Sequence, residues 1–127
     1  MARILVVEDN AANMKLAVFL LEREGHEVMQ AGDAEAGIRL ARDAHPELIL
    51  MDVQLPGMDG LAATRLLKND AATRDIRIVA LTALAMSGDR ERIEAACCDG
   101  YLAKPYGHAQ LSETVRRILG RGDARAE

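Results

Sequence analysis

The sequence predicts an α/β domain in which five parallel strands alternate with five helices. Five short apolar segments recur along the chain, and each precedes a longer segment whose apolar residues have helical spacing. No two-residue hairpin turn joins one apolar segment to the next, so neighbouring strands are not expected to be antiparallel. Strands that alternate with amphipathic helices form a parallel sheet with helices on both faces. A length of 127 residues suits one such domain.

The predicted strands are short runs of apolar and β-branched residues. The first run is β-branched and ends at two acids, the second is weaker, and the third is apolar throughout. In chain order, the predicted strands are Arg3–Val7, Glu27–Gln30, Leu48–Met51, Ile76–Leu81 and Gly100–Ala103.

Three of the predicted helices follow residues that can cap a helix, namely Asn10, Asp33 and Ser87, because their side chains can accept hydrogen bonds from free N–H groups. The helices are expected from Asn10 to about Glu24, from Asp33 to before Pro46, from Leu61 to about Asn69, from Ser87 to about Cys97, and around Leu111, Val115 and Ile118. We expect Gly120 and Gly122 to end the last helix, leaving residues 121–127 as a short frayed tail after a domain of residues 1–120.

Composition excludes several classes of function. The net charge of −4 and an aromatic content of 2% argue against binding to nucleic acid or to acidic membranes. No apolar run approaches the ~20 residues that span a bilayer, and the N-terminus lacks a signal-peptide core, which favours a cytoplasmic protein. The adjacent Cys97 and Cys98 cannot form a disulfide framework, and we expect two buried thiols.

Five strands suit the doubly wound, flavodoxin-like order 2-1-3-4-5 better than an eight-stranded barrel.

Chemically useful side chains follow four of the five strands. They are Glu8 and Asp9 after the first strand, Asp52 after the third, Thr82 after the fourth and Lys104 after the fifth. Each alone has an ordinary structural explanation, such as a helix cap or a solvated charge. The carboxyl ends of parallel strands share one edge of the sheet, so these side chains are expected to converge there.

Three clustered carboxylates favour a hard divalent cation such as Mg²⁺. A carboxylate beside Mg²⁺, a lysine and a hydroxyl is suited to receive a phosphoryl group. Asp52 would be the nucleophile, while Lys104 and Thr82 would bind phosphoryl oxygens.

The chain resembles the response-regulator receiver domains (CheY-like) of two-component signalling over residues 3 to 119. The matching segments are Ile4–Asn10, Leu50–Gly60, Leu81–Ala83 and Gly100–Pro105, and their joint occurrence in this order is highly specific. The segments Asn10–Leu16 and Met51–Pro56 are most like those of the DivK-type single-domain regulators, which govern the bacterial cell cycle and polar differentiation. Similar segments occur in receivers of hybrid kinases.

The resemblance implies a role for each site residue. Asp52 is implied to be the phosphoacceptor, and Asp9, Asp52, the backbone carbonyl of Gln54 and Glu8 are implied to hold Mg²⁺. Lys104 is implied to contact the phosphoryl group, and its bond to Pro105 is usually cis in the family. Thr82 and Tyr101 are implied to be a switch pair, in which the hydroxyl turns toward the phosphoryl group and the ring turns inward.

The resemblance also implies the partners. A histidine kinase or a histidine phosphotransfer protein would supply the phosphoryl group. A downstream regulatory protein would contact a surface formed by Ser87–Cys98, Tyr101, Tyr106 and the last helix. We expect a monomer that signals by protein contact, with a role as phosphoryl shuttle or as a receiver related to those of hybrid kinases as the alternatives.

Two other classes of protein fit the sequence less well. A phosphohydrolase with an aspartyl-phosphate intermediate needs an acid two residues after its nucleophile, where this chain has Gln54. A flavin or dinucleotide protein needs a phosphate-binding loop after the first strand, where this chain has acids. We therefore expect no enzyme activity beyond self-phosphorylation and self-dephosphorylation. A fairly long-lived phosphoryl form is expected because Leu84 cannot orient an attacking water, although the amide of Gln54 could.

Overall fold

A computed structural model describes the backbone of residues 2–83 and 87–126, and the side chains of residues 2–83 and 90–120. Its five strands form one parallel sheet of order β2-β1-β3-β4-β5. The predicted fold class and strand order are therefore confirmed. The elements in chain order are β1 (Arg3–Val7), α1 (Ala11–Arg23), β2 (Glu27–Ala31), α2 (Ala34–Ala44), β3 (Leu48–Asp52), α3 (Gly60–Lys68), β4 (Arg77–Thr82), α4 (Ser87–Ala95), β5 (Gly100–Ala103) and α5 (His108–Ala126).

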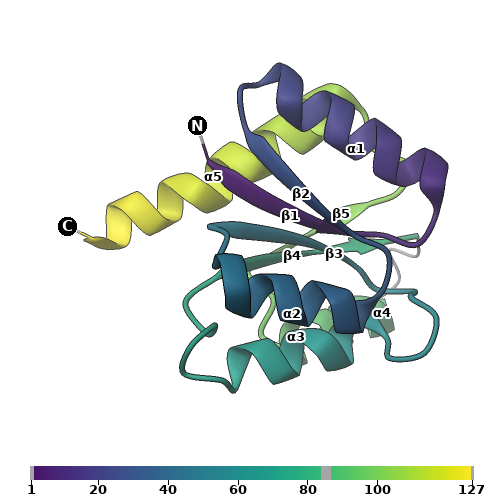
Figure 1. Cartoon of the computed structure of the whole chain (residues 1–127), viewed down its shortest axis with the longest axis vertical. Coiled ribbons are helices and arrows are strands. Elements are labelled where there is room, and N and C mark those ends of the chain that lie inside the picture. The colour runs from purple at the N-terminus through teal and green to yellow at the C-terminus, as the bar shows by residue number, and fades with distance from the viewer. Residues whose placement is uncertain (1, 84–86, 127) are drawn as a thin grey trace.

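Helices cover both faces of the sheet, as Figure 1 shows, with α1 and α5 on one face and α2, α3 and α4 on the other. The central strand β3 is buried at every position, which explains why its sequence is an unbroken apolar run rather than an alternating one. Alternate residues of each strand serve the two faces. In β1, for example, Ile4 and Val6 pack toward α1 and α5, whereas Leu5 and Val7 pack toward α2 and α3.

Capping residues begin three of the helices. The side chains of Asn10, Asp33 and Asp59 accept hydrogen bonds from the backbone N–H groups of Asn13, Ala36 and Ala62 at 2.9, 2.8 and 2.8 Å. These bonds satisfy donors that a helix start otherwise leaves unpaired. They also fix where α1 and α3 begin, directly after the loops that carry the acidic residues.

The expected end of the last helix at Gly120 is wrong, because α5 continues through both glycines to Ala126. A glycine within a helix costs roughly 0.5–1 kcal/mol relative to alanine, but it keeps the N–H donor and carbonyl acceptor that the helix needs. Figure 1 shows this end of α5 projecting beyond the sheet. The division into a receiver of residues 1–120 and a separate tail stays a prediction.

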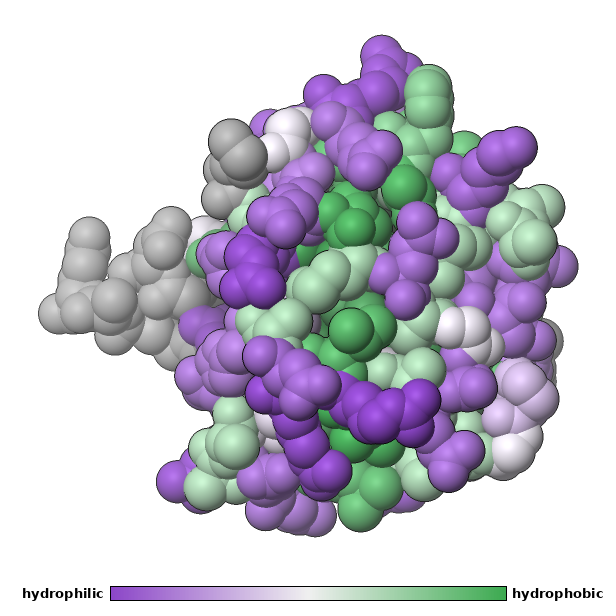
Figure 2. Space-filling view, viewed as in Figure 1, coloured by the Kyte–Doolittle hydropathy of each residue, from purple (hydrophilic) through white to green (hydrophobic). Residues whose placement is uncertain are grey.

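Apolar surface reaches solvent in a band between hydrophilic side chains on the face that Figure 2 shows. The edge strand β2 lies on this face in the same view, and its residues Val28 and Met29 are only partly buried. Within the described part of the chain, no helix combines the length and the apolar character that crossing a bilayer requires.

Candidate functional site

The carboxyl ends of the strands bring the acidic residues together. Asp52 is the last residue of β3, and Glu8 and Asp9 directly follow the neighbouring strand β1. Backbone bonds continue the sheet past both strand ends, from Glu8 N–H to the carbonyl of Ala31 at 3.0 Å and from Val53 N–H to the carbonyl of Leu81 at 2.9 Å. These bonds fix the backbone on which the acidic side chains are carried.

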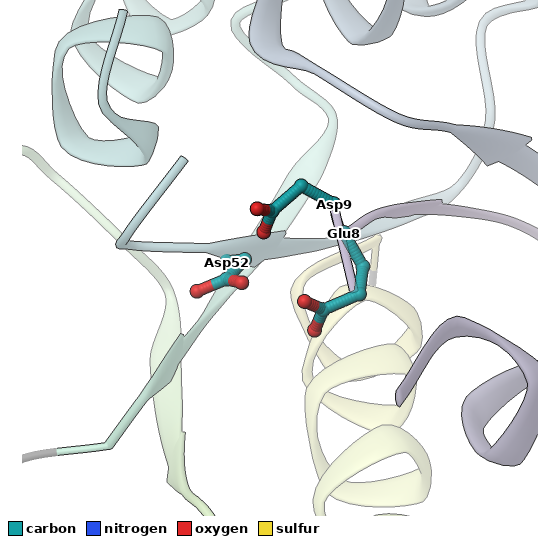
Figure 3. A group of neighbouring side chains, drawn as sticks. All are labelled: Glu8, Asp9 and Asp52. Atoms are coloured by element: carbon teal, nitrogen blue, oxygen red, sulfur yellow. The ribbon is translucent and has the colours of Figure 1, made fainter. Parts of the chain in front are cut away.

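Glu8, Asp9 and Asp52 could hold a metal ion. Figure 3 shows their side chains converging, and one carboxylate oxygen from each lies within 4.8 Å of the others. Glu8 and Asp52 are buried, with exposed fractions of 3% and 4%, whereas Asp9 is exposed. An all-carboxylate donor set with one member open to solvent fits a hard cation such as Mg²⁺, which keeps several of its waters.

Lys104 lies between two of these carboxylates. Its Nζ donates hydrogen bonds to Glu8 Oε1 at 2.9 Å and to Asp52 Oδ2 at 3.1 Å. The other oxygen of Asp52 accepts a bond from the backbone N–H of Gln54 at 3.0 Å, and Asn10 N–H donates to Glu8 Oε2 at 3.3 Å. Both buried carboxylates are thus hydrogen-bonded through both of their oxygens, which burial of charged groups requires.

Burial and charge shift the pKa values at this site. Burial raises the pKa of the Glu8 carboxyl, and the neighbouring Asp52 adds to the rise, while Lys104 opposes it. Burial alone would lower the pKa of Lys104, but its hydrogen bonds to Glu8 and Asp52 outweigh that effect and raise it. Lys104 therefore stays positively charged beside the carboxylates across the physiological pH range.

Thr82 and Tyr101 lie on the same face of the sheet. Thr82 is the last residue of β4 and is buried, whereas Tyr101 in β5 is 36% exposed. In the parallel register, Tyr101 pairs with Ala80, and Thr82 pairs with Ala103. Since paired residues of neighbouring parallel strands point to the same side, all four side chains share one face, the one that α4 covers.

The loop after β5 carries Lys104 into the site. The backbone N–H of Lys104 donates to the carbonyl of Thr82 at 2.7 Å, and the peptide bond from Lys104 to Pro105 is cis. Beyond this loop lies a cavity of about 400 Å³ whose lining combines α1, the end of β4 and the loop; it consists of Asn13, Leu16, Ala83, Lys104, Pro105 and Tyr106. Burial raises the pKa of the Tyr106 phenol.

Gly60 is a site residue that the sequence analysis missed. A Cβ atom at this first residue of α3 would collide with the backbone carbonyl oxygen of Asp52. The backbone N–H of Gly60 also donates to the carbonyl of Val53 at 3.1 Å. Only glycine allows this approach, and the turn-forming run around it gives no signal that distinguishes Gly60 from the nearby Gly57.

The expectation of two buried cysteines is wrong for Cys97. Its side chain is exposed. Its φ of +69° is left-handed, so the helical conformation cannot continue through this residue after α4. Cys98 is partly buried, and burial raises its pKa to about 11. The left-handed backbone conformation at Cys97 turns the chain at this point, and the two thiols differ in their exposure.

Comparisons with known proteins agree with this arrangement. The model of the response regulator receiver domain family matches residues 4–116. The polar-differentiation response regulator DivK of Brucella ovis is 44% identical over 92% of this chain and 95% of its own length. DivK of Brucella anthropi is 43% identical over the same shares.

Solved structures show the same fold. The receiver domain of a sensor histidine kinase from Pseudomonas aeruginosa PAO1, with a magnesium ion coordinated in its active-site cleft, is 38% identical with a TM-score of 0.88, covering 94% of this chain and 98% of that one. A CheY-like receiver domain protein from Methanospirillum hungatei is 26% identical with a TM-score of 0.91, over 98% of both chains.

A doubly wound sheet with three acids and a lysine at the carboxyl ends of its strands defines the class of phosphoacceptor domains in two-component signalling. The chain belongs to the response regulator receiver domain family, and it is homologous to the DivK and CheY-like response regulators.

Proposed function

We propose that the protein is a single-domain response regulator that accepts a phosphoryl group on Asp52. The observation that carries this proposal is the buried Asp52 carboxylate, which lies between an acidic cluster fit for Mg²⁺ and the ammonium of Lys104, 3.1 Å away. In the proposed transfer, an oxygen of Asp52 bonds to phosphorus as the bond from phosphorus to the donor's histidine nitrogen breaks. The electron pair of the broken bond stays on that nitrogen.

Asp9, Asp52, Glu8 and the backbone carbonyl of Gln54 would hold the Mg²⁺ ion. When bound, Mg²⁺ neutralises negative charge that develops on the phosphoryl oxygens. Lys104 would keep its contact with Glu8 and present its remaining donors to a phosphoryl oxygen. The hydroxyl of Thr82 would hold another oxygen, and the small side chain of Ala83 leaves the approach to Asp52 open.

The output of the proposed regulator is a change of its surface. The phosphoryl group adds charge and acceptor oxygens at Asp52, which would draw Thr82 toward the site and let the ring of Tyr101 turn inward. The surface formed by α4 through Cys98, Tyr101, Tyr106 and α5 would then bind a regulatory protein. Coupling of this kind is typically ~1–3 kcal/mol.

The relatives suggest the cellular setting. A histidine kinase or histidine phosphotransfer protein would be the phosphodonor, and the DivK relatives favour a role in the cell cycle or polar differentiation. We propose a cytoplasmic monomer that signals by protein contact, without nucleic-acid or membrane binding. Its chemistry would be limited to gaining and losing its own phosphoryl group.

Incubation with acetyl phosphate and Mg²⁺ tests the proposal. We expect the wild-type protein to gain one phosphoryl group, detected by intact-protein mass spectrometry, and the Asp52→Asn variant to gain none. Asp59→Asn is a matched control, because Asp59 is exposed and asparagine can also cap α3. Labelling that survives in Asp52→Asn, or in the presence of EDTA, would contradict the proposed site.

The lifetime of the phosphoryl form is a further part of the proposal. Leu84, whose side chain cannot orient a water, lies outside the described residues, and the Gln54 side chain is exposed. We expect the label to persist well beyond seconds. Turnover of small phosphomonoesters would instead support the phosphohydrolase alternative.

A further inference from the structure

An arginine on α4 contacts the ring of Tyr101. The guanidinium carbon of Arg90 lies 5.4 Å from the centre of the Tyr101 ring, within the range of a cation–π interaction. Both residues are exposed, and they come from neighbouring elements, α4 and β5. The contact therefore joins a helix of the proposed output surface to the aromatic residue of the proposed switch, in the orientation where the ring faces outward.

The strand residues beside Tyr101 on this face of the sheet are small. Across this face lie Ala80, which pairs with Tyr101, and Ala103, which lies two residues further along β5. Beyond them is Thr82, the buried hydroxyl at the end of β4. Since both intervening residues are alanines, the described side chains next to the ring on β4 and β5 are small. The outward position of Tyr101 thus needs a cause other than steric exclusion by these two strands.

We propose that Arg90 is a positioning residue that holds Tyr101 outward and so opposes activation of the receiver. This inference rests on the proposed function, because it assigns the outward ring to the unphosphorylated state. The Arg90 contact stabilises only that state, and turning the ring inward breaks it. A cation–π contact at an exposed site changes the ratio of two states by roughly two- to fivefold. Arg90 therefore changes how readily the receiver is activated but is not required for activation.

Beryllofluoride with Mg²⁺ mimics the phosphoryl group on an aspartate. Its binding affinity therefore reports how readily the receiver is activated. We expect Arg90→Ala to bind beryllofluoride roughly two- to fivefold more tightly than the wild-type protein. Arg90→Lys keeps the charge and should restore part of the wild-type affinity. The helix tolerates both changes, since alanine and lysine are strong helix formers. The matched control is Arg65→Ala, which removes the same charge from an exposed position on α3 and should leave the affinity unchanged.

A double-mutant cycle distinguishes contact with the ring from a general effect of charge. In a Tyr101→Leu background, which has no ring, Arg90→Ala should no longer alter the affinity for beryllofluoride. An effect of equal size in that background would overturn the proposal, as would unchanged or weaker binding by Arg90→Ala alone. If the wild-type protein binds no beryllofluoride, the proposed phosphoacceptor function itself fails. That result differs from one in which the wild-type protein and Arg90→Ala bind beryllofluoride equally well, which overturns only the role of Arg90.

Discussion

Lys104 is the residue on which the charge balance of the site depends. Its ammonium hydrogen-bonds two buried carboxylates, Glu8 and Asp52, that would otherwise repel each other. Both partners also belong to the group of carboxylates that could hold a metal ion. The lysine and a bound cation would therefore share the same ligands, and each would weaken the attraction of the site for the other.

The first prediction concerns Lys104→Met. We expect this variant to bind Mg²⁺ several-fold more tightly than the wild-type protein, because the competing positive charge is gone while the carboxylates remain. Isothermal titration calorimetry at constant pH and ionic strength measures the change. Lys15→Met, on the exposed surface of α1, is the control and should show wild-type affinity. Equal or weaker Mg²⁺ binding by Lys104→Met would show that the lysine does not compete.

At the scale of single side chains, the sequence predicts some of the site residues but not all of their contacts. The acids at the strand ends could be anticipated because a parallel sheet gathers the carboxyl ends of its strands at one edge. The partners of Tyr101 could not, since contact with Arg90 depends on how α4 lies over β5. The exposure of Cys97 also depended on a local left-handed turn that a neutral pair of cysteines does not signal.

Among the elements, α3 is the one whose start is coupled to the proposed phosphoacceptor. Asp59 caps α3, and Gly60 brings its first turn against the backbone carbonyl of Asp52. Thr64 holds this turn from within the helix, where its hydroxyl donates to the carbonyl of Gly60 at 2.8 Å. The first turn of α3 therefore contacts Asp52 through backbone atoms rather than through a side chain.

A substitution at Gly60 tests this coupling. Gly60→Ala should lower the free energy of unfolding by ~1–3 kcal/mol, because the added methyl group forces the backbone of Asp52 or of α3 to shift. It should also slow labelling of Asp52 by acetyl phosphate. Gly32→Ala is the control, since a Cβ there meets nothing within 4 Å, and its stability and labelling should match the wild type. Normal stability of Gly60→Ala would mean that α3 can move away without cost.

Element boundaries followed from sequence where side chains cap the helices and apolar runs fill the strands. Asn10 and Asp33 cap α1 and α2 as expected, because their side-chain oxygens accept hydrogen bonds from free backbone N–H groups at the helix starts. The end of α5 did not follow from the glycines, since a helix can continue through a residue of low propensity when its backbone bonds remain intact.

At the scale of the whole molecule, the two ends of the sheet are held in different ways. At the end opposite the acidic cluster, Lys68 donates to the carboxylate of Asp99 at 2.9 Å and to the carbonyl of Ile76 at 2.8 Å. The same carboxylate oxygen of Asp99 accepts from Ile78 N–H at 2.8 Å. This largely buried network ties the end of α3 to the starts of β4 and β5. At the other end, Lys104 joins the loop after β5 to the carbonyl of Thr82 and to the carboxylates of Glu8 and Asp52.

Removing the brace should affect stability more than chemistry. Lys68→Met is expected to lower the free energy of unfolding by ~1–3 kcal/mol in urea denaturation, because Asp99 would lose the counter-ion beside its partly buried carboxylate. The folded variant should still be labelled at Asp52 by acetyl phosphate at the wild-type rate. Lys15→Met again provides a surface control for stability. A large loss of labelling in folded Lys68→Met would show that the two ends of the sheet are coupled.

The course of α5 has a practical consequence for experiments in cells. The helix starts near the loop that carries Lys104 and runs back along the sheet, so its last turns lie at the end of the molecule opposite the acidic cluster, as Figure 1 shows. A fluorescent protein or affinity handle fused after this helix would stand clear of Asp52. Such a fusion would allow subcellular distribution and phosphorylation to be observed in the same molecule.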